Sequence, residues 1–385
     1  MIAHAAPPAP AIVVGPPVAF GGITVRLGAG TRRIEVQGDG RIIVRREVPA
    51  GPRRLSVGLP AGIGAVRVRA VGSGGARWSA VTRIRVLPRS ALRPGRLPGF
   101  VDAPLQRDVE HLVAGMPAIS GVYVQHLVSG CGASYNADAQ FPAASTLKAG
   151  ILVDAVRRGR AAQLAPVLDR MIRDSDDVAA NQVLAALGNG SGDAGAVSVT
   201  DTLHRLGLDR SLVRRPYIIE DARRPLPIAT VRAPALFTNF ITTPFELSRL
   251  MVAIHRGAVG TGGVARLGIG RPAARTDLLA RLLDVRDTSK LVAGIPGGVP
   301  VAHKTGYTEQ VKHDSGIIYL ASGPVVAAVM TWSASGVSDA VGDRFIAEVA
   351  QAATRRLATG GSCPRVPIRV RGGHATRVIH GEDRS

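Results

Sequence analysis

Ser145 and Lys148 are the residues whose types and spacing first point to chemistry, in the stretch FPAASTLKAG at positions 141–150. Three residues of α-helix bring both side chains to one face, so the lysine amine can reach the serine hydroxyl. A serine at a helix start also has backbone N–H groups nearby that stabilise an oxyanion. The lysine is a base only if burial or a second cation lowers its pKa. The pair alone also fits an ordinary helix start, because serine is a common N-cap.

Two further motifs follow along the chain. Ser175-Asp176-Asp177 precedes an expected helix, and an N-cap with acidic first-turn residues is its plain structural interpretation. Lys304-Thr305-Gly306 follows an apolar run and should lie at the end of a strand. The chain has only four lysines, at positions 148, 290, 304 and 312, and two of them, Lys148 and Lys304, fall in two of the three motifs.

The elements expected around the motifs alternate between helix and strand. From residue 101 the patterns predict a helix capped by Asp102, a strand at 121–130, helices within 145–158 and 164–187, two strands joined by a Gly-Pro turn at 317–332, and a closing helix at 338–357. This order predicts an α+β fold built in layers.

The preceding part, residues 22–88, has short alternating runs separated by Gly, Pro and Asp, which predicts a small antiparallel β-sandwich. Composition then divides the rest: 1–21 as a disordered segment or targeting remnant, 89–100 as a proline-rich linker, 101–358 as the domain with the motifs, and 359–385 as a basic flexible tail. Residues 1–21 lack the basic start of a secretory signal and make a poor signal peptide.

The formal net charge is +20, and 44 of the 48 basic residues are arginine. The arginines are scattered and aromatics are few, which argues against nucleic acid as a partner. We interpret the charge as a solvated surface suited to anionic polymers of a cell envelope. No uninterrupted apolar run reaches the roughly 18 residues that a membrane span needs.

Taken in order, the three motifs resemble the serine β-lactamase and penicillin-binding protein superfamily. The segments FPAASTLK, TTPFELSRLM (242–251) and PVAHKTGYTEQVKHDSGIIYL (300–320) are similar to class A β-lactamase-like proteins. The resemblance covers roughly residues 101–357, and each motif agrees with its expected element. It implies a β-lactamase-like domain, an antiparallel sheet flanked by helices, after the all-β region.

The resemblance also implies roles for residues in the motifs. Ser145 would be the acylated nucleophile, Lys148 its proton acceptor, and Ser175 the group that passes a proton to the leaving nitrogen. Lys304 would lower the pKa of Lys148 and, with Thr305, hold a substrate carboxylate. The substrate would lie along the edge of the strand near 300–308, beside Gly306, Tyr307 and Thr308. The backbone N–H groups of Ser145 and Tyr307 would form the oxyanion hole.

Several residues depart from the family pattern. Asp177 stands where the family usually has asparagine; a carboxylate only accepts hydrogen bonds, and its charge would raise the pKa of Lys148. Tyr307 replaces a small hydroxyl residue, and Thr308 is expected to supply that hydroxyl. The interval between the first two motifs is short, which predicts a more open cleft.

The segment before 242–251 lacks the usual Glu-x-x-Leu-Asn pattern of the deacylating glutamate. Glu220 is the candidate base, with Asp221 beside it. An equally acceptable interpretation pairs Glu220 with the neighbouring arginines. Without a placed base, acylation could proceed while hydrolysis stalls.

The family fold would bring Cys131 close to Cys363, which implies a disulfide and an oxidising, exported setting. Two unrelated buried cysteines are the alternative. His303 and His313 are expected to serve packing or strand-end hydrogen bonds. No Cys, His and carboxylate cluster has metal-ligand spacing, so we expect no metal and no cofactor.

These observations predict an exported, monomeric serine hydrolase that acts through a Ser145 acyl-enzyme on β-lactams or D-alanyl peptides of peptidoglycan. The alternative is a cell-wall or penicillin-binding protein that keeps the fold with little turnover; Asp177 and the absent loop pattern favour it. A basic adaptor for nucleic acid is supported by charge alone.

Overall fold

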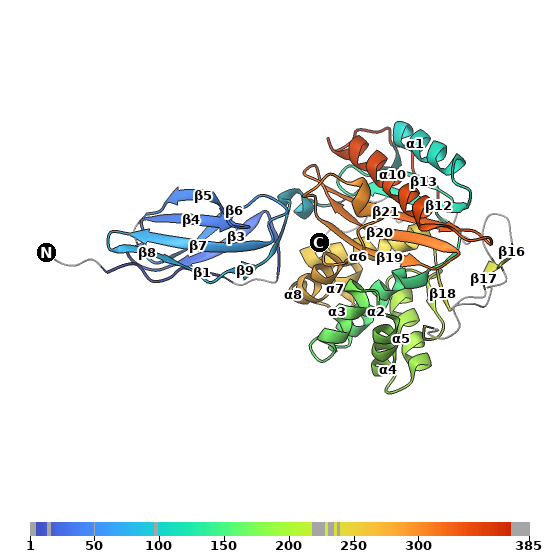
Figure 1. The fold of residues 1–385 in the computed structure, drawn as a ribbon, viewed down its shortest axis with the longest axis horizontal. Helices are drawn as coiled ribbons and strands as arrows, with labels where there is room; N and C mark the ends of the chain where they lie inside the picture. Colours follow the sequence, from blue (N-terminus) through green and yellow to red (C-terminus); the bar gives the residue numbers. More distant parts are fainter. Residues whose placement is uncertain are drawn as a thin grey trace, which may run out of the picture.

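The computed structural model describes residues 5–13, 17–49, 51–95, 99–217, 228–229, 235–236 and 239–370. An all-β region comes first, and a larger region of helices packed on a sheet follows it (Figure 1). The predicted α+β fold class with a preceding all-β region is confirmed.

Alternating apolar residues form the core of the all-β region. Val25, Ile34, Val66 and Val68 are fully or almost fully buried between its sheets, while their sequence neighbours point outward. The sheets have strand orders β1-β3-β6, β5-β4-β7-β8 with β9 paired to β7, and β10-β2. Their strands are β1 (Ala11–Ile12), β2 (Val18–Phe20), β3 (Gly22–Leu27), β4 (Arg33–Gly38), β5 (Arg41–Glu47), β6 (Arg53–Gly58), β7 (Ala65–Gly72), β8 (Gly75–Trp78), β9 (Thr82–Arg83) and β10 (Arg85–Leu87).

Strands β1 and β2 lie within residues 1–21, for which we expected disorder or a targeting remnant. Ala11 of β1 pairs with Arg26 of β3, and Val18 of β2 pairs with Arg85 of β10. Both strands are short, and the strands that order them come later in the chain. Their local sequence pattern therefore gave no indication of strands. The boundaries of the predicted domains stay a prediction.

Part of the expected 89–100 linker is also regular. It contains the short helix η1 (Arg89–Leu92) and the start of strand β11 (Phe100–Val101). The Ser90 hydroxyl donates to the carbonyl of Leu320 at 3.2 Å, and Arg256 donates to the carbonyl of Gly95 at 3.5 Å. Contacts from distant sequence positions thus hold the segment between the two regions.

A six-stranded sheet organises the larger region, with order β11-β13-β12-β21-β20-β19. All neighbours are antiparallel except β11 and β13, and β19 is an edge strand. The remaining strands of the sheet are β12 (Ile119–His126), β13 (Cys131–Tyr135), β19 (Val301–Tyr307), β20 (Val311–Tyr319) and β21 (Pro324–Trp332).

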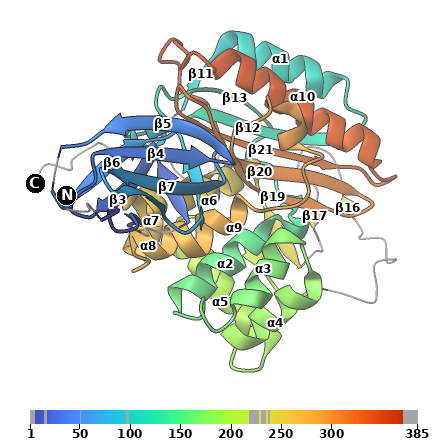
Figure 2. The same ribbon diagram turned by 60° about the vertical axis from the view of Figure 1, so that its left-hand side comes forward.

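Helices cover both faces of this sheet. Helices α1 (Ala103–Ala114) and α10 (Asp339–Leu357) lie side by side on one face (Figures 1 and 2). As predicted, the Asp102 side chain caps α1 by accepting from the N–H of Leu105. Leu105 and Phe345 from these helices pack on Val124 of the sheet.

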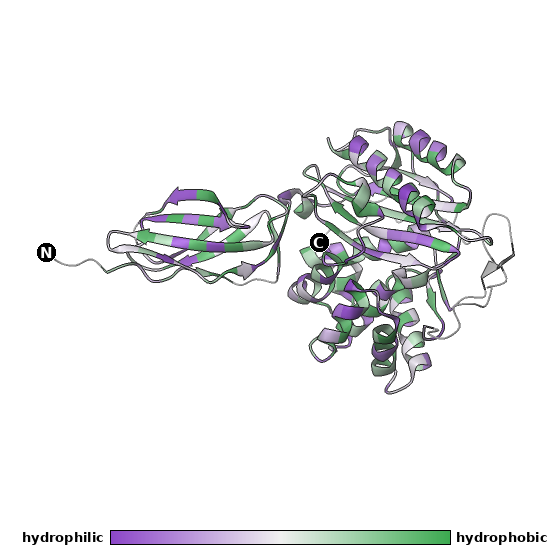
Figure 3. Ribbon diagram, in the orientation of Figure 1, coloured by the Kyte–Doolittle hydropathy of each residue, from purple (hydrophilic) through white to green (hydrophobic). Residues whose placement is uncertain are grey.

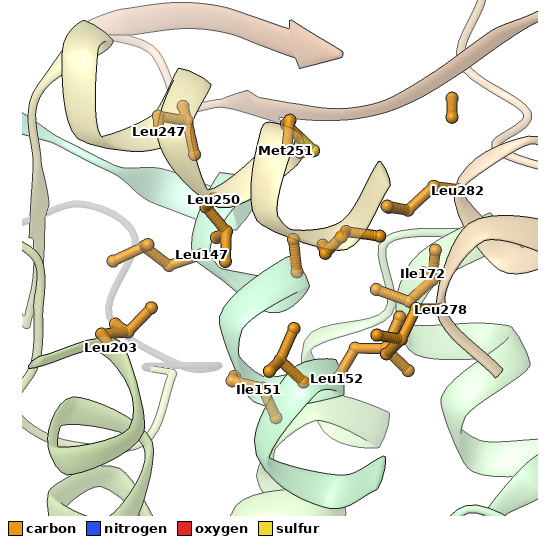
Figure 4. Close-up of a cluster of buried hydrophobic side chains, with 14 of the residues drawn as sticks. Leu147, Ile151, Leu152, Ile172, Leu203, Leu247, Leu250, Met251, Leu278 and Leu282 are labelled. Atoms are coloured by element: carbon orange, nitrogen blue, oxygen red, sulfur yellow. The ribbon is translucent and has the colours of Figure 1, made fainter. Parts of the chain in front are cut away.

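The other face carries the remaining helices. Leu147, Ile151 and Leu152 pack against Leu250 of α6 in a buried apolar cluster (Figure 4). These helices are α2 (Lys148–Arg157), α3 (Ala165–Arg173), α4 (Asp177–Leu187), α5 (Gly192–Arg205), α6 (Pro244–Val259), α7 (Gly262–Arg266), α8 (Arg271–Ala273) and α9 (Ala280–Leu282). Shorter pieces between them are η2 (Ala144–Leu147), the π-helix η3 (Ala274–Leu279), η4 (Leu291–Gly294) and strands β14 (Phe141–Pro142), β15 (Leu212–Val213), β16 (Ile228–Ala229), β17 (Ala235–Leu236) and β18 (Phe240–Thr242).

Cys131 and Cys363 form a disulfide, which confirms the predicted pair. It ties the segment after α10 to the start of β13. Beyond it, Val101 donates to the carbonyl of Val366 at 2.8 Å, and Ile368 donates to Gly99 at 2.9 Å. The first part of the expected flexible tail is therefore paired with the β11 segment.

Among the described residues, no helix combines the length and apolar character needed to cross a bilayer.

Candidate active site

Ser145 lies in the short helix η2, immediately before α2. The preceding residue, Ala144, has a φ of +46°, a left-handed conformation that is unusual for alanine. The N–H of Thr146 donates to the Ala143 carbonyl at 3.1 Å, which helps to hold this turn. Strain of this kind before a reactive residue is a common feature of functional sites.

Lys148 is the first residue of α2, and its side chain is buried. Its Nζ lies 2.9 Å from Ser145 Oγ, 2.6 Å from the Ser175 carbonyl oxygen and 2.5 Å from Asp177 Oδ1. The three hydrogens of the ammonium therefore have three acceptors. The helix spacing inferred from the sequence does bring the lysine to the serine.

Ser175 stands between α3 and α4 with a φ of +59°, again in the left-handed region. Asp176 caps α4 by accepting from the N–H of Ala179 at 2.9 Å, as its position in the motif predicts. Only α3 lies between α2 and this turn. Val178, in the first turn of α4, is 47% exposed.

Lys304 approaches from the edge strand β19. Its buried Nζ donates to Ser175 Oγ at 2.9 Å and to the Thr305 carbonyl at 2.9 Å. The Thr305 hydroxyl is buried and has no hydrogen-bond partner among the described residues. This hydroxyl is therefore a buried polar group at the site that no described residue satisfies.

Gly306 lets β19 come close to the turn that carries Ser145. A Cβ at this position would lie 3.0 Å from the Ala143 carbonyl oxygen and 3.0 Å from the Thr146 nitrogen. Any larger residue would push the strand away from η2. Glycine is therefore the residue that allows the serine turn and the strand to approach each other.

Two lysines share this buried site, and their charges interact. Burial lowers the pKa of Lys148, because a buried ammonium loses its hydration. The carboxylate of Asp177 acts in the opposite direction, as its charge predicts, but burial outweighs it. Burial and the repulsion from Lys148 lower the pKa of Lys304 to about 7. Part of the Lys304 population is then neutral at physiological pH.

Tyr217 is a site residue that the sequence did not reveal. Its ring lies over Lys148, with Nζ 4.6 Å from the ring centroid, and its hydroxyl donates to the Ala144 carbonyl at 3.3 Å. Burial raises the pKa of Tyr217 well above its usual value, so the phenol stays protonated. This residue comes from the segment before 242–251, where a deacylating glutamate was expected.

Helix α4 fixes the position of Tyr217. Asn181 donates to the Tyr217 carbonyl at 2.8 Å and accepts from its N–H at 2.7 Å, while the ring stacks on Phe240 at 4.0 Å. Asn181 lies one helical turn after Asp177, so both side chains are on the same face of α4. This spacing is the sequence clue that could have linked Asn181 to the site. The candidate base Glu220, with Asp221, lies outside the described residues.

A cavity of about 590 Å³ is lined by residues of the motifs, among them Ser175, Lys304, Thr305 and Tyr307. Other charged residues also line it, among them Lys290, which is buried and paired with Asp287 at 2.8 Å and Asp343 at 3.2 Å. Lys290 belongs to none of the three motifs. The sequence clue that could have pointed to it is that the chain has only four lysines.

Tyr307, which also lines the cavity, is the last residue of β19 and precedes the turn to β20. Tyr307 is 55% exposed, with Lys290 Nζ at 5.4 Å and Lys312 Nζ at 5.7 Å from its ring centroid. The Thr308 hydroxyl accepts from the N–H of Gln310 at 3.2 Å. That hydroxyl therefore already has a partner in the turn.

The buried histidines hold the strands together. His303 Nδ1 lies 3.0 Å from the Asp314 carboxylate, which also accepts from the N–H of Leu291 at 3.1 Å. His313 contacts the carbonyl oxygens of Pro142 and Lys312, each at 2.7 Å. Across the described ranges, no group of three His, Cys, Asp or Glu side chains could hold a metal ion.

The family model described as the beta-lactamase enzyme family matches residues 104–166 and 155–357, which together span the whole constellation. The chain belongs to the beta-lactamase enzyme family. It is thus a member of the serine β-lactamase and penicillin-binding protein superfamily, as the ordered motifs indicated. A comparison with curated protein sequences gave no match.

Solved structures of the same fold include PBP-A, which is 25% identical with a TM-score of 0.54, over 67% of this chain and 97% of that one. A point mutant of PBP-A, described as an acyl-enzyme complex with penicillin G, is also 25% identical at a TM-score of 0.54, over 67% of this chain and 98% of that one. A beta-lactamase from Streptosporangium roseum shares the fold at 21% identity, with a TM-score of 0.54, over 67% of this chain and 99% of that one.

Proposed function

We propose that this member of the beta-lactamase family is a serine acyl-transfer enzyme. Ser145 forms an acyl-enzyme with β-lactams or with D-alanyl peptides, both of which present an amide beside a carboxylate. The observation that carries the proposal is the buried amine of Lys148, 2.9 Å from Ser145 Oγ, with its pKa lowered by burial. A lowered pKa increases the fraction of neutral amine that can accept a proton.

In the neutral amine, two N–H groups remain for the Ser175 carbonyl and Asp177, and the lone pair is left for the Ser145 hydroxyl. Ser145 Oγ attacks the substrate carbonyl carbon while its proton passes to Lys148. As the C–N bond breaks, the leaving nitrogen takes a proton from Ser175, and Ser175 regains one from the Lys148 ammonium, whose Nζ lies 3.5 Å from Ser175 Oγ. The Ser175 hydroxyl is free to donate because its oxygen accepts from Lys304 at 2.9 Å.

Lys304 and Thr305 supply the carboxylate site in this proposal. The Thr305 hydroxyl has no partner within the described part of the chain, and the charged form of Lys304 gains a counter-ion when a carboxylate arrives. Substrate carboxylate therefore raises the pKa of Lys304 and favours its protonated form. The edge of β19, with Gly306 and Tyr307, offers main-chain hydrogen bonds to an extended substrate.

A second function, penicillin binding with little turnover, is favoured by Asp177 and Tyr217. Asp177 holds Lys148 in an ion pair at 2.5 Å, which opposes the effect of burial on the pKa and reduces the fraction of neutral amine. Tyr217 occupies the space above that amine with a protonated phenol, which is no general base. Both features slow the step in which water releases the acyl group.

The proposed setting is the cell envelope or its exterior. The Cys131–Cys363 disulfide supports it, because such bonds persist in oxidising compartments. Members of the beta-lactamase family are typically exported. Peptidoglycan stem peptides would be the natural partners there.

Intact mass spectrometry with penicillin G, on the wild type and on Ser145→Ala, tests the proposal. We expect an adduct of the drug's full mass on the wild type alone. An adduct that persists for hours identifies the slow-turnover form, whereas Ser145-dependent loss of drug without a lasting adduct identifies a β-lactamase. An adduct on both proteins, or neither adduct nor drug loss with penicillin and D-alanyl peptides, would contradict the proposal.

A further inference from the structure

The positive charge of the chain is concentrated in the all-β region. Residues 1–95 contain 15 arginines and three acidic residues, a net charge of +12 out of the +20 of the whole chain. Two of the three acids are Glu35 and Glu47. The third, Asp39, is engaged in a turn, where its carboxylate accepts from the N–H groups of Gly64 and Ala65 at 3.1 and 2.8 Å. Few carboxylates are thus available to offset the arginines.

The outer face of the sheet β5-β4-β7-β8 collects several of these arginines. Figure 3 shows hydrophilic residues alternating with hydrophobic ones along its strands. The strand register places Arg45, Glu35, Arg69 and Trp78 directly opposite one another in a row across the four strands. With neighbouring strands about 4.8 Å apart, this row extends for about 14 Å. Gln37 and Arg67 form the next row.

The arginines on this face are held in place rather than left to move freely. Glu35 is buried, and its carboxylate meets Arg69 at 3.3 Å, Arg45 at 3.6 Å and Arg33 at 3.9 Å. One carboxylate against three guanidinium groups leaves an excess of two positive charges. The side chains of Arg33, Arg45 and Arg69 remain 45%, 67% and 41% exposed, so they can meet a second anion.

Trp78 and Gln37 order the fourth guanidinium group. Arg67 lies over the Trp78 ring at 4.4 Å from its centroid, and its Nε donates to the side-chain oxygen of Gln37. Arg69 lies 5.6 Å from the same ring. Fixing a guanidinium before a ligand arrives reduces the conformational entropy lost on binding. Glu47, opposite Arg33, is the other acid on the face.

We propose that this arginine face, formed by Arg33, Arg45, Arg67 and Arg69 around Glu35, binds an acidic polysaccharide of the cell envelope. The face already holds one carboxylate, that of Glu35, between guanidinium groups, and repeated carboxylates along a glycan chain present the same chemistry. A single exposed arginine contact is weak, so a polymer that meets several at once gains affinity from their number. The proposal is independent of the acyl-transfer chemistry.

Two observations favour a glycan over nucleic acid. Trp78 is the only aromatic side chain in these rows, and Arg67 already covers it, so stacked bases would find no platform. The Cys131–Cys363 disulfide also fits a protein outside the cytoplasm. The proposed role is to hold the catalytic region close to the cell wall.

Binding of fluorescent polygalacturonate to the full-length protein at two salt concentrations tests this. The double variant Arg45→Gln/Arg67→Gln leaves Arg69 paired with Glu35. The matched control, Arg107→Gln/Arg355→Gln, removes two exposed arginines from α1 and α10 and has the same net charge. We expect about tenfold weaker binding for the first variant and less than about a twofold change for the control.

A third variant, Ile42→Glu, adds a negative charge to the same face without removing any arginine, since Ile42 is 43% exposed opposite Gln37. It should also weaken binding, which keeps the test valid if the double variant unfolds. Equal weakening by the α1/α10 control would overturn the proposal in favour of diffuse charge. Equal or tighter binding of a DNA duplex of about 20 base pairs, or of neutral dextran, would overturn it as well, as would an absence of binding. Penicillin acylation, measured in parallel, should be unchanged in all these variants.

Discussion

At the scale of single residues, the central question is which influence on Lys148 dominates. Its amine is buried, which favours the neutral base, yet Asp177 lies 2.5 Å away and favours the ammonium. Burial prevails, so the pKa is lowered, but by less than it would be without the carboxylate. The proposed acylation rate should therefore respond directly to this one negative charge.

Replacing Asp177 with asparagine should accelerate acylation by about tenfold at neutral pH, the effect of about one pKa unit. Removing the carboxylate lowers the pKa of Lys148 further, so the rising limb of the pH–rate profile should move to lower pH. Stopped-flow acylation by penicillin across a range of about pH 5 to 9 measures both effects. Asp193→Asn, in the first turn of α5, is the control. Slower acylation with an unmoved profile would mean that Asp177 is needed as an acceptor.

Tyr217 offers a second test at this scale. Tyr217→Ala should open space beside Lys148 for water and shorten the adduct lifetime by about tenfold. Tyr217→Phe keeps the ring and loses only the hydrogen bond to Ala144, so its adduct lifetime should stay close to that of the wild type. Time-resolved intact mass gives both lifetimes. If the phenylalanine variant also loses its adduct quickly, the hydroxyl and not the ring is the important group.

At the scale of elements, the site depends on how closely β19 approaches η2. The histidine and aspartate pair His303–Asp314 ties β19 to β20, and the Asp314 carboxylate also accepts from Leu291. Gly306 then allows the strand to lie directly against the serine turn. The position of an edge strand therefore controls the geometry around Ser145, the proposed nucleophile, on a distant part of the chain.

Gly306→Ala should lower the acylation rate more than about tenfold and destabilise the fold by about 1–2 kcal/mol, because the new Cβ meets backbone atoms at 3.0 Å. Gly297→Ala is a matched control, since a Cβ there meets nothing within 4 Å. Urea unfolding and penicillin acylation of both variants provide the comparison. Normal acylation in Gly306→Ala would show that the strand can withdraw without affecting the nucleophile.

At the scale of the whole molecule, the disulfide fixes one end of the chain to the sheet. It closes a span of 232 residues, and long spans remove the most entropy from the unfolded chain. It also holds the segment that pairs with β11 through Val366 and Ile368. The disulfide packs in the apolar cluster formed with α1 and α10. That cluster lies on the sheet face opposite η2 and α2, where Ser145 and Lys148 are found.

Cys131→Ser/Cys363→Ser should therefore lose about 3–5 kcal/mol of unfolding free energy while acylating penicillin at the wild-type rate at about 25 °C. Trypsin should also cut faster at Arg365 and Arg369 in this variant. Reduced wild type serves as the reference, and its urea midpoint should match that of the variant. An unchanged midpoint would indicate that the sheet and helix contacts alone hold this segment.

Interactions within one element could be predicted from the sequence. The three-residue spacing of Ser145 and Lys148, the caps at Asp102 and Asp176, and the alternation of the strands all depend on neighbours in the chain. The ordered motifs and their surroundings then identified the family, and with it the disulfide. The net charge of +20 was also evident from the sequence. The sequence did not show that several of the arginines lie together on one face of a sheet.

Only the tertiary structure decided which distant groups meet in the site. Lys304 reaches Ser175 across 129 residues, and Tyr217 is held over Lys148 by helix α4, which begins well before it in the chain. The balance between burial and the Asp177 charge is likewise a property of the packed site, because desolvation depends on everything that surrounds the amine. A local pattern specifies which residues could react, whereas burial and long-range packing set their pKa values and their partners.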